Sequence, residues 1–288
     1  MPAPTHDEPV MILCGGMGTR LREVTERIPK PMVDIGGMPI LWHIMKLYRH
    51  YGYRRFILCL GYGSWDIKQW FLRYTEILAD LTVTIDGSRD PYVHAHPAGE
   101  DWEVTLAETG LHSGTGHRVK VASRYVDTDR FLLTYGDGIG DIDLDALRAT
   151  HEQGGRLGTL TGVLPPARYG EMDVDGDRIL HFQEKPPGRG GHVNGGFFVF
   201  EREFIDYLPP DDPPHMFEHA PLRKLAADGE LSMYRHDSFW MGMDTPREYA
   251  ALNRMWEQGT AAWKVWDDAL PADSPVEGAR PRPATPGS

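Results

Sequence analysis

The feature that most constrains the fold is an apolar strand near the amino end that runs directly into a glycine-rich loop. Val10 to Leu13 is short, apolar and partly β-branched, which is typical of a strand buried on both faces of a sheet. Gly15, Gly16 and Gly18 follow it. Because glycine adopts positive φ and carries no Cβ, such a loop brings backbone N–H groups against an anionic ligand. The stretch favours an α/β sheet whose first loop holds a phosphate chain, although a tight strand-to-helix turn would use the same glycines.

Two cations accompany this loop. Arg20 lies within it, and Lys30 stands between Pro29 and Pro31, which hold the chain extended on either side. Two cations and a row of amides suit one polyphosphate. The dinucleotide fingerprint is excluded because Leu21 stands where it needs a glycine, and the Walker loop is excluded because Gly-Thr-Arg replaces Gly-Lys-Ser/Thr.

The rest of the chain alternates between strand and helix patterns. Apolar residues at helical spacing from Pro39 to Tyr51 are followed by an apolar strand at Arg55 to Gly61 and by a helix that Ser64 caps. This rhythm predicts a parallel sheet with right-handed crossovers. Further strands are predicted at 81–85, 102–107, 130–135, 157–164, 169–174, 178–183, 193–200 and 231–235, and further helices at 144–153, 202–208, 218–228 and 246–258.

Length and composition limit the class of protein. A chain of 288 residues allows one large α/β domain or two small ones, and one domain is predicted at 9–266, with a flexible amino end at 1–8 and a flexible Pro, Ala and Ser-rich tail at 267–288. The opening residues lack the basic and apolar regions of a secretion signal, and no apolar run is long enough to span a bilayer, which predicts a cytoplasmic protein without a membrane partner. The formal charge of −12 argues against a nucleic-acid partner. Cys14 and Cys59 lie in predicted strands and are interpreted as buried free thiols.

An acidic residue follows the predicted strand at 130–135. Asp137 stands between Gly136 and Gly138, and ligands in open α/β sheets sit beyond the carboxyl ends of the strands. Asp137 is therefore a candidate metal ligand, although Asp-Gly is also a common turn dipeptide. Carboxylates without clustered Cys or His favour Mg²⁺ over zinc.

Several strings occur in an order that resembles one enzyme family. The strings are LCGGMGTRL, PKPM, TGLHSGTGHR, YGDG, EKP, NGG and FWMGMDT. Together they resemble the sugar-1-phosphate nucleotidyltransferases, and the third string resembles the glucose-1-phosphate cytidylyltransferase branch. The resemblance spans roughly Val10 to Trp266. It implies a Rossmann-like mixed, mostly parallel sheet flanked by helices, of the nucleotide-diphospho-sugar transferase type, with a small β-hairpin sugar-binding part and a C-terminal helical segment.

The same resemblance implies a reaction and its residues. The reaction transfers a nucleotidyl group from CTP to α-D-glucose 1-phosphate with Mg²⁺, giving CDP-glucose and pyrophosphate. Arg20, Lys30, Asp137 and Lys185 are implied to be catalytic. Nucleotide binding is implied for Leu13, Cys14, Gly15, Gly16, Met17, Gly18, Thr19, Arg20, Lys30, Thr109, Ser113, Thr115, Arg118 and Gly136. Sugar-phosphate binding is implied for Tyr135, Gly170, Glu184, Lys185, Asn194 and Gly195, and metal binding for Asp137 and Asp244.

Three positions leave alternatives open. Asp244 would instead cap the helix that begins at Pro246, and both interpretations hold if Thr245 caps while Asp244 points at the metal. Gly114 stands where the cytidylyltransferase string has Met, which adds backbone freedom, and His117 replaces a glycine. Met241 and Gly242 replace Gln-Pro of the relatives, which bears on the identity of the sugar.

Alternative functions follow from these departures. One is a sister enzyme that uses UTP, dTTP, ATP or GTP, or a modified sugar 1-phosphate of a deoxysugar pathway. Another is a non-catalytic nucleotide-sugar sensor, against which the intact Lys30, Asp137, Lys185 and Asp244 argue. The aromatic stretch at 256–266 is predicted to pack on the body or on a neighbouring subunit, and the chain is predicted to form a homo-oligomer.

Overall fold

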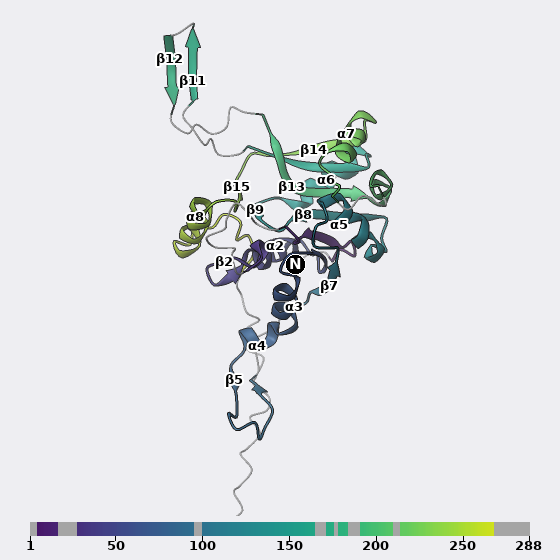
Figure 1. The fold of residues 1–288 in the computed structure, drawn as a ribbon. Helices are drawn as coiled ribbons and strands as arrows, with labels where there is room; N and C mark the ends of the chain where they lie inside the picture. The colour runs from purple at the N-terminus through teal and green to yellow at the C-terminus, as the bar shows by residue number, and fades with distance from the viewer. Residues whose placement is uncertain are drawn as a thin grey trace, which may run out of the picture. The chain divides into compact units, whose positions relative to one another are not determined.

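The computed structural model describes residues 5–16, 28–94, 100–164, 171–175, 178–183, 191–209 and 214–267 (Figure 1). Two compact units are present. The first comprises Met1–Lys68 with Trp102–Trp266, and the second comprises Gln69–Asp101 with Asp267–Ser288. The first unit holds the sheet, the core and the site described below.

A seven-stranded sheet forms the centre of the first unit within the described residues. Every neighbouring pair in it is parallel except the two pairs made by β13, which runs antiparallel to β10 and β8. The predicted mixed, mostly parallel sheet is therefore confirmed. In spatial order the strands are β14 (Leu231–His236), β10 (Gly158–Val163), β13 (Val193–Glu201), β8 (Arg130–Tyr135), β1 (Val10–Leu13), β4 (Arg55–Leu60) and β7 (Glu103–Glu108).

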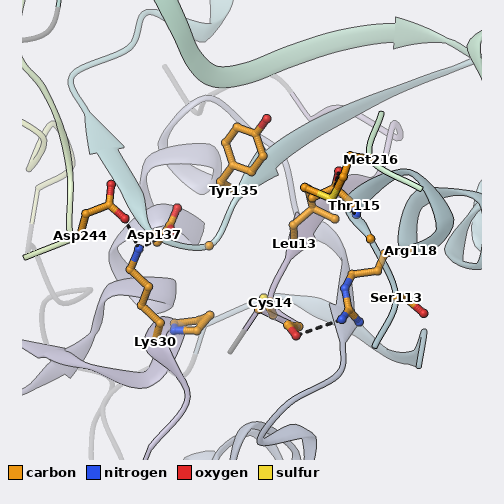
Figure 2. Close-up of a pocket in the computed structure, with 15 residues that line it drawn as sticks. Leu13, Cys14, Lys30, Ser113, Thr115, Arg118, Tyr135, Asp137, Met216 and Asp244 are labelled. Carbon is orange, nitrogen blue, oxygen red and sulfur yellow. Dashed lines mark hydrogen bonds and ion pairs between the residues drawn. The ribbon is translucent and has the colours of Figure 1, made fainter. Parts of the chain in front are cut away.

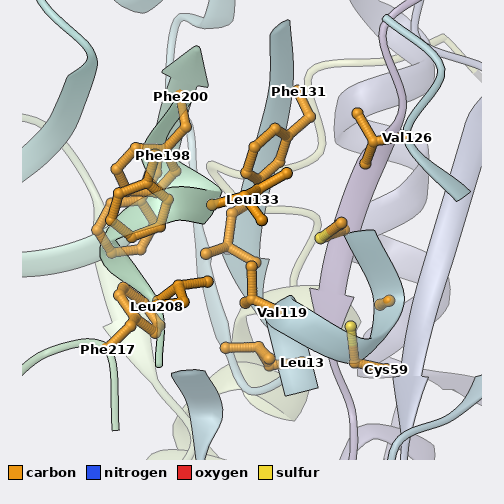
Figure 3. Packing of buried hydrophobic residues seen from close by; sticks show 14 of the residues in the cluster. Leu13, Cys59, Val119, Val126, Phe131, Leu133, Phe198, Phe200, Leu208 and Phe217 are labelled. Carbon is orange, nitrogen blue, oxygen red and sulfur yellow. The ribbon is translucent and has the colours of Figure 1, made fainter. Parts of the chain in front are cut away.

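Helices cover both faces of this sheet. Side chains alternate between the two faces along each strand, so each strand contributes residues to both packing layers. On one face, Phe198 and Phe200 of β13 pack with residues of β8, α5 (Thr115–Ala122) and α7 (Ala220–Ala227) (Figure 3). On the other face, Phe197 stacks on Tyr48 of α2 (Ile40–His50), with ring centroids 5.9 Å apart. On this second face α6 (Leu144–Gly154) also packs, through hydrogen bonds of its His151 to β10 and β13. The central strands are thus buried on both faces, as their apolar runs predicted.

A short ladder outside the main sheet was not predicted. In it, β9 (Gly138–Gly140) pairs antiparallel with β15 (Trp240–Gly242), so that Gly138 lies opposite Gly242. The amide of Met243 then donates to the carbonyl oxygen of Asp137 over 2.8 Å. This register brings the segment after β8 beside the segment that precedes α8 (Pro246–Glu257).

Several predicted elements differ in extent. The helix predicted from Ser64 is two helices, α3 (Ser64–Leu72) and α4 (Tyr74–Leu78), and within α3 and α4 only Ile67 is buried. The strand predicted at 81–85 is shorter: β5 (Leu81–Thr82) pairs with β6 (Tyr92–Val93), a strand that was not predicted. The predicted hairpin is present as β11 (Glu171–Asp175) and β12 (Arg178–Gln183). The described part also contains β2 (Asp34–Ile35), β3 (Met38–Pro39), η2 (Lys30–Met32), η3 (Ser123–Tyr125) and η4 (Arg202–Tyr207).

The C-terminal aromatic residues pack on the body of the first unit. The ring of Trp256 lies 4.6 Å from that of the buried His43 of α2, and the rings of Trp263 and Trp266 lie 6.2 Å from it. The Nε2–H of His43 donates to the carbonyl of Ile35, and its Nδ1 accepts from Trp263, so the imidazole is neutral. Burial in this cluster lowers the pKa of His43 to about 4. Packing on the body is thus the confirmed alternative for these aromatic residues.

None of the helices among the described residues combines the length and the apolar character that crossing a bilayer requires.

Candidate active site

A cleft of about 500 Å³ opens at the carboxyl ends of the parallel strands β1 and β8. It lies where ligands bind in open α/β sheets. Most of its wall consists of residues predicted from the sequence, and Pro31, Gly114 and Met216 are additions that the sequence did not indicate (Figure 2). The predicted residues in the wall are Leu13, Cys14, Gly15, Gly16, Lys30, Ser113, Thr115, Arg118, Tyr135, Gly136, Asp137 and Asp244.

One end of the cleft joins a lysine to two carboxylates. Lys30 Nζ lies 2.5 Å from Asp137 Oδ2 and 2.8 Å from Asp244 Oδ1. Lys30 is 8% exposed, whereas the side chains of Asp137 and Asp244 are 38% and 34% exposed and face the cleft. Burial alone would lower the pKa of Lys30, but the charges and hydrogen bonds of the two aspartates outweigh it, so the pKa is raised and the lysine stays charged. The two predicted metal-binding carboxylates therefore meet at one cation.

The start of α8 explains why Asp244 points into this end. Thr245 is the N-cap residue, and its hydroxyl accepts from the amide of Glu248. The Glu248 carboxylate reaches back and accepts from the amides of Asp244 and Thr245 at 2.7 and 2.9 Å. This capping box satisfies the helix terminus without the Asp244 side chain. Thr245 is therefore the cap and Asp244 faces the cleft, while the role of Asp244 as a metal ligand stays a prediction.

The other end of the cleft is organised by Arg118. Its guanidinium donates to the carbonyl oxygens of Gly15, Leu60, Gly110 and Leu111, which follow or end three different strands. It also donates to the hydroxyl of Thr109, over 2.8 Å. Arg118 is 4% exposed, and burial lowers its pKa. The arginine therefore ties the first loop to the segment that follows β7. Thr109 is 2% exposed and lies behind the wall of the cleft.

The second glycine stretch is only partly a loop. No helix was predicted between residues 108 and 118, but α5 begins at Thr115. Thr115 and Arg118 are therefore held by the first turn of a helix, and Ser113 precedes it. The Ser113 hydroxyl donates to the carbonyl of Thr109 over 2.6 Å, which closes the loop between β7 and α5. The sequence did not predict the start of this helix, because the three glycines in the stretch lower its helix propensity.

Gly114 is required for close approach rather than for backbone freedom. Its φ of −73° and ψ of 169° are ordinary extended values that any residue adopts. A Cβ at this position would collide with the carbonyl oxygens of Pro214 and His215. The sequence interpretation of the Met-to-Gly departure as added freedom is therefore wrong. The chain segment at 214–215 fills the space that a side chain would need.

The predicted sugar-side residues lie beside the acidic end. The Tyr135 hydroxyl donates to Glu218 over 2.7 Å and accepts from Asn194 Nδ2 over 3.2 Å. Burial and the adjacent Glu218 charge raise the pKa of Tyr135, so this hydroxyl keeps its proton. The carbonyl of Gly195 accepts from the Trp240 indole over 2.8 Å. Glu218 contacts a site residue, but the sequence did not single it out. It was predicted to be the first residue of a helix at 218–228, whereas α7 begins at Ala220 and Glu218 precedes it.

Seven predicted site residues lie outside the described residues. They are Met17, Gly18, Thr19, Arg20, Gly170, Glu184 and Lys185.

The two cysteines are buried and free, as predicted. Burial raises the pKa of both thiols. Among the described residues no group of three or more His, Cys, Asp or Glu side chains gathers as a metal site.

Known proteins are similar to this chain in sequence and in fold. Residues 9–259 match the model of the nucleotidyl transferase family. The chain is 45% identical over 258 residues to a glucose-1-phosphate cytidylyltransferase of Salmonella typhi, covering 89% of this chain and 99% of the relative. It is 44% identical over 256 residues to a probable glucose-1-phosphate cytidylyltransferase of Bacillus subtilis, covering 89% and 99%.

A solved structure shares the fold. The crystal structure of HddC from Yersinia pseudotuberculosis complexed with GMP-PN is 25% identical, covers 86% of this chain and 99% of that chain, and superposes with a TM-score of 0.61. Nucleotidyltransferases of this family generally use a divalent metal. The family model, the 45% identity and the shared fold together show that this chain belongs to the nucleotidyl transferase family.

Proposed function

We propose that this chain transfers a cytidylyl group from CTP to α-D-glucose 1-phosphate and releases pyrophosphate. The relatives that are 44% and 45% identical carry the name of this activity. The observation that supports it most directly is the meeting of Lys30, Asp137 and Asp244 in the same cleft as the first glycine loop. Two anionic substrates and a leaving group need positive charge, which Lys30 supplies directly and the two carboxylates would supply by holding a cation.

The reaction is a displacement at the α-phosphorus of CTP. A sugar-phosphate oxygen forms the new P–O bond, the α,β-bridging P–O bond breaks, and pyrophosphate leaves with that electron pair. Because the attacking oxygen is already ionised at neutral pH, the reaction needs no general base. The protein therefore contributes alignment of the two anions and neutralisation of charge.

The acidic end of the cleft fits a divalent cation, and we propose Mg²⁺. Two oxygen ligands from Asp137 and Asp244 already converge on one positive charge, and both carboxylates are about one third exposed toward the cleft. Mg²⁺ binds one or two carboxylates and completes its shell with water and phosphate oxygens. When bound, the ion neutralises charge on the reacting phosphates. Lys30, whose Nζ donates to both carboxylates, would then be placed to contact a phosphate oxygen.

The remaining roles divide along the cleft. The backbone from Cys14 to Gly16, together with Arg20 from outside the described residues, would hold the triphosphate. The cytosine would lie at the end formed by Ser113, Thr115 and Arg118. Glucose would lie beside Tyr135 and Asn194, with Gly170, Glu184 and Lys185 contributing the sugar-phosphate contacts that the family resemblance implies.

A sister activity on a modified sugar 1-phosphate is the second candidate. Met241 and Gly242, which depart from the pattern of the relatives, lie in β15, with one residue between this strand and Asp244, and pair with Ile139 and Gly138 of β9. A change at Met241 or Gly242 therefore alters the strand that leads to Asp244. It favours a difference in the sugar rather than in the base.

A panel of triphosphates against sugar 1-phosphates tests both candidates. CTP, UTP, dTTP, ATP and GTP are each combined with glucose 1-phosphate and with deoxy or amino analogues, with and without Mg²⁺, and pyrophosphate release is measured. We expect the highest kcat/KM for CTP with glucose 1-phosphate and loss of turnover without the metal. A clear preference for another triphosphate or sugar would select the sister activity, and binding without any product would indicate a sensor.

We also propose that the chain associates with copies of itself. The second unit exposes large apolar side chains, including Ile85 at 93% and Tyr92 at 58%. Clusters of exposed apolar residues mark association surfaces more often than free surface.

A further inference from the structure

Glu218 joins two hydroxyl groups that belong to different parts of the cleft. Its Oε2 accepts from the Thr115 hydroxyl over 2.5 Å, and its Oε1 accepts from the Tyr135 hydroxyl over 2.7 Å. Thr115 is the first residue of α5, next to the Ser113 and Arg118 end. Tyr135 is the last residue of β8, next to Asn194. One carboxylate thus contacts both the proposed nucleotide half and the proposed sugar half.

The hydroxyl protons are committed by this arrangement. Each hydroxyl carries one proton, and an ionised carboxylate only accepts, so Thr115 and Tyr135 both donate to Glu218. One lone pair of each hydroxyl also accepts, Thr115 from the Phe217 amide over 3.2 Å and Tyr135 from Asn194, and the second lone pair of each stays available. Toward the cleft the two hydroxyls therefore present acceptors, which suit donors such as sugar hydroxyls.

The charge of Glu218 is kept away from the phosphates. Thr115, Met216 and Tyr135 line the described part of the cleft in front of it. A carboxylate exposed in the cleft would repel two anionic substrates, whereas one behind two hydroxyls orients them without meeting the phosphates. This position distinguishes Glu218 from Asp137 and Asp244, which line the cleft.

The backbone before Glu218 holds it in place. The carbonyl of His215 accepts from the amide of Gly116 over 3.0 Å, which docks the 215–218 segment on the first turn of α5. Phe217 is fully buried in the apolar cluster of the sheet. A side chain at Gly114 would collide with this segment. The glycine therefore allows Glu218 to come close enough to connect α5 with β8.

We propose that Glu218 is a positioning residue that couples the two half-sites, so that nucleotide and sugar phosphate bind synergistically. Both ligands need the Thr115 and Tyr135 hydroxyls in the orientation that one carboxylate sets. The first ligand therefore orders the bridge, and the second ligand binds to an already ordered site. The inference rests on the proposed function, because it assigns the two ends of the cleft to the two substrates.

Glu218→Gln tests the coupling with little change of shape. A glutamine oxygen accepts from one hydroxyl, but its NH₂ group donates, so the other hydroxyl must turn its proton away. The affinity for a non-reacting α,β-methylene analogue of CTP is measured by calorimetry with and without glucose 1-phosphate. In the wild type we expect the sugar phosphate to tighten analogue binding roughly tenfold, within the usual range of coupling. In Glu218→Gln we expect this ratio to fall close to one, while binding of the analogue alone changes less than about threefold.

Matched variants separate coupling from folding. Glu203→Gln makes the same substitution at an exposed glutamate of η4 and should keep the wild-type ratio. Thr115→Val and Tyr135→Phe each remove one arm of the bridge, and each should lower the ratio without changing the thermal midpoint. These two variants also carry the test if Glu218→Gln does not fold.

The outcomes distinguish the inference from the function on which it rests. An unchanged ratio in Glu218→Gln, or equal weakening of all binding together with a lower thermal midpoint, would overturn the coupling role. Absence of synergy in the wild type would overturn it as well. Failure of the CTP assignment would instead appear in the wild-type panel, and the ratio is then measured with the triphosphate and sugar phosphate that the panel selects.

Discussion

The two ends of the cleft each contain a buried cation, but the partners of the two cations differ. Lys30 is 8% exposed and pairs with the carboxylates of Asp137 and Asp244, which are themselves about one third exposed. Arg118 is 4% exposed and donates to main-chain carbonyls at the ends of β1, β4 and β7 and to a buried threonine.

This difference teaches what each cation is able to do. The partners of Lys30 are carboxylates open to the cleft. A phosphate oxygen is able to take their place around the ammonium group, and a metal ion is able to take the place of the ammonium group between them, without disturbing the fold. The partners of Arg118 are fixed by the sheet, and releasing them would leave buried carbonyls without donors, which is costly. We therefore assign exchange of partners to the lysine end and preservation of shape to the arginine end.

The largest expected effect is on turnover at the lysine end. Asp137→Asn removes one of the two charges proposed to hold the metal, and loss of one such contact typically lowers the rate by about 10²–10³-fold. Steady-state pyrophosphate release and a thermal melt measure the effect, with the exposed Asp206→Asn as the matched control. Near-normal turnover of Asp137→Asn would refute the proposal that Lys30 exchanges its carboxylate partners during the reaction.

The second effect is on folding and compares the two cations directly. Arg118→Lys leaves several buried carbonyls without their donors and should lower the free energy of unfolding by roughly 3 kcal/mol. Lys30→Met should lower it by about 1 kcal/mol or less, because the carboxylates that it leaves are screened by solvent. Urea denaturation of the two variants gives both values. Equal losses would break the comparison.

The smallest effect is on metal affinity and sharpens the role of Lys30. In the nucleotide-free protein the ammonium group competes with a divalent ion for the same two oxygens. Lys30→Met should therefore bind Mn²⁺ about tenfold more tightly, equivalent to ~1.4 kcal/mol, although its turnover falls. Mn²⁺ titration by electron paramagnetic resonance measures this, and weaker binding in the variant would contradict the competition.

Much of the fold was predictable because its signals are local. The apolar runs of β1, β4 and β8, and the apolar spacing of α2, depend on nearest neighbours and were correctly placed. The start of α5 at Thr115 was missed because glycines at 114 and 116 obscure helical propensity, and the docking of His215 on its first turn compensates from a distance of about a hundred residues. The start of α7 was predicted at Glu218, two residues before its position at Ala220.

The site divides in the same way. The residue types at Lys30, Asp137 and Asp244 were recognisable in the chain, and their roles as catalytic and metal-binding residues stay predictions. The ladder of β9 with β15, the four carbonyls around Arg118 and the bridge of Glu218 join segments that are far apart in sequence. No periodicity or motif within one segment encodes such a pairing.

The amino-acid sequence by itself determined the alternation of strands and helices, the phosphate-compatible first loop and the identity of the charged side chains. Only the tertiary structure decided which charges meet, because the distance between Asp137 and Asp244 depends on the register of two short strands and on a capping box rather than on either local sequence. It also decided that one buried cation keeps exchangeable partners while the other is tied to the backbone.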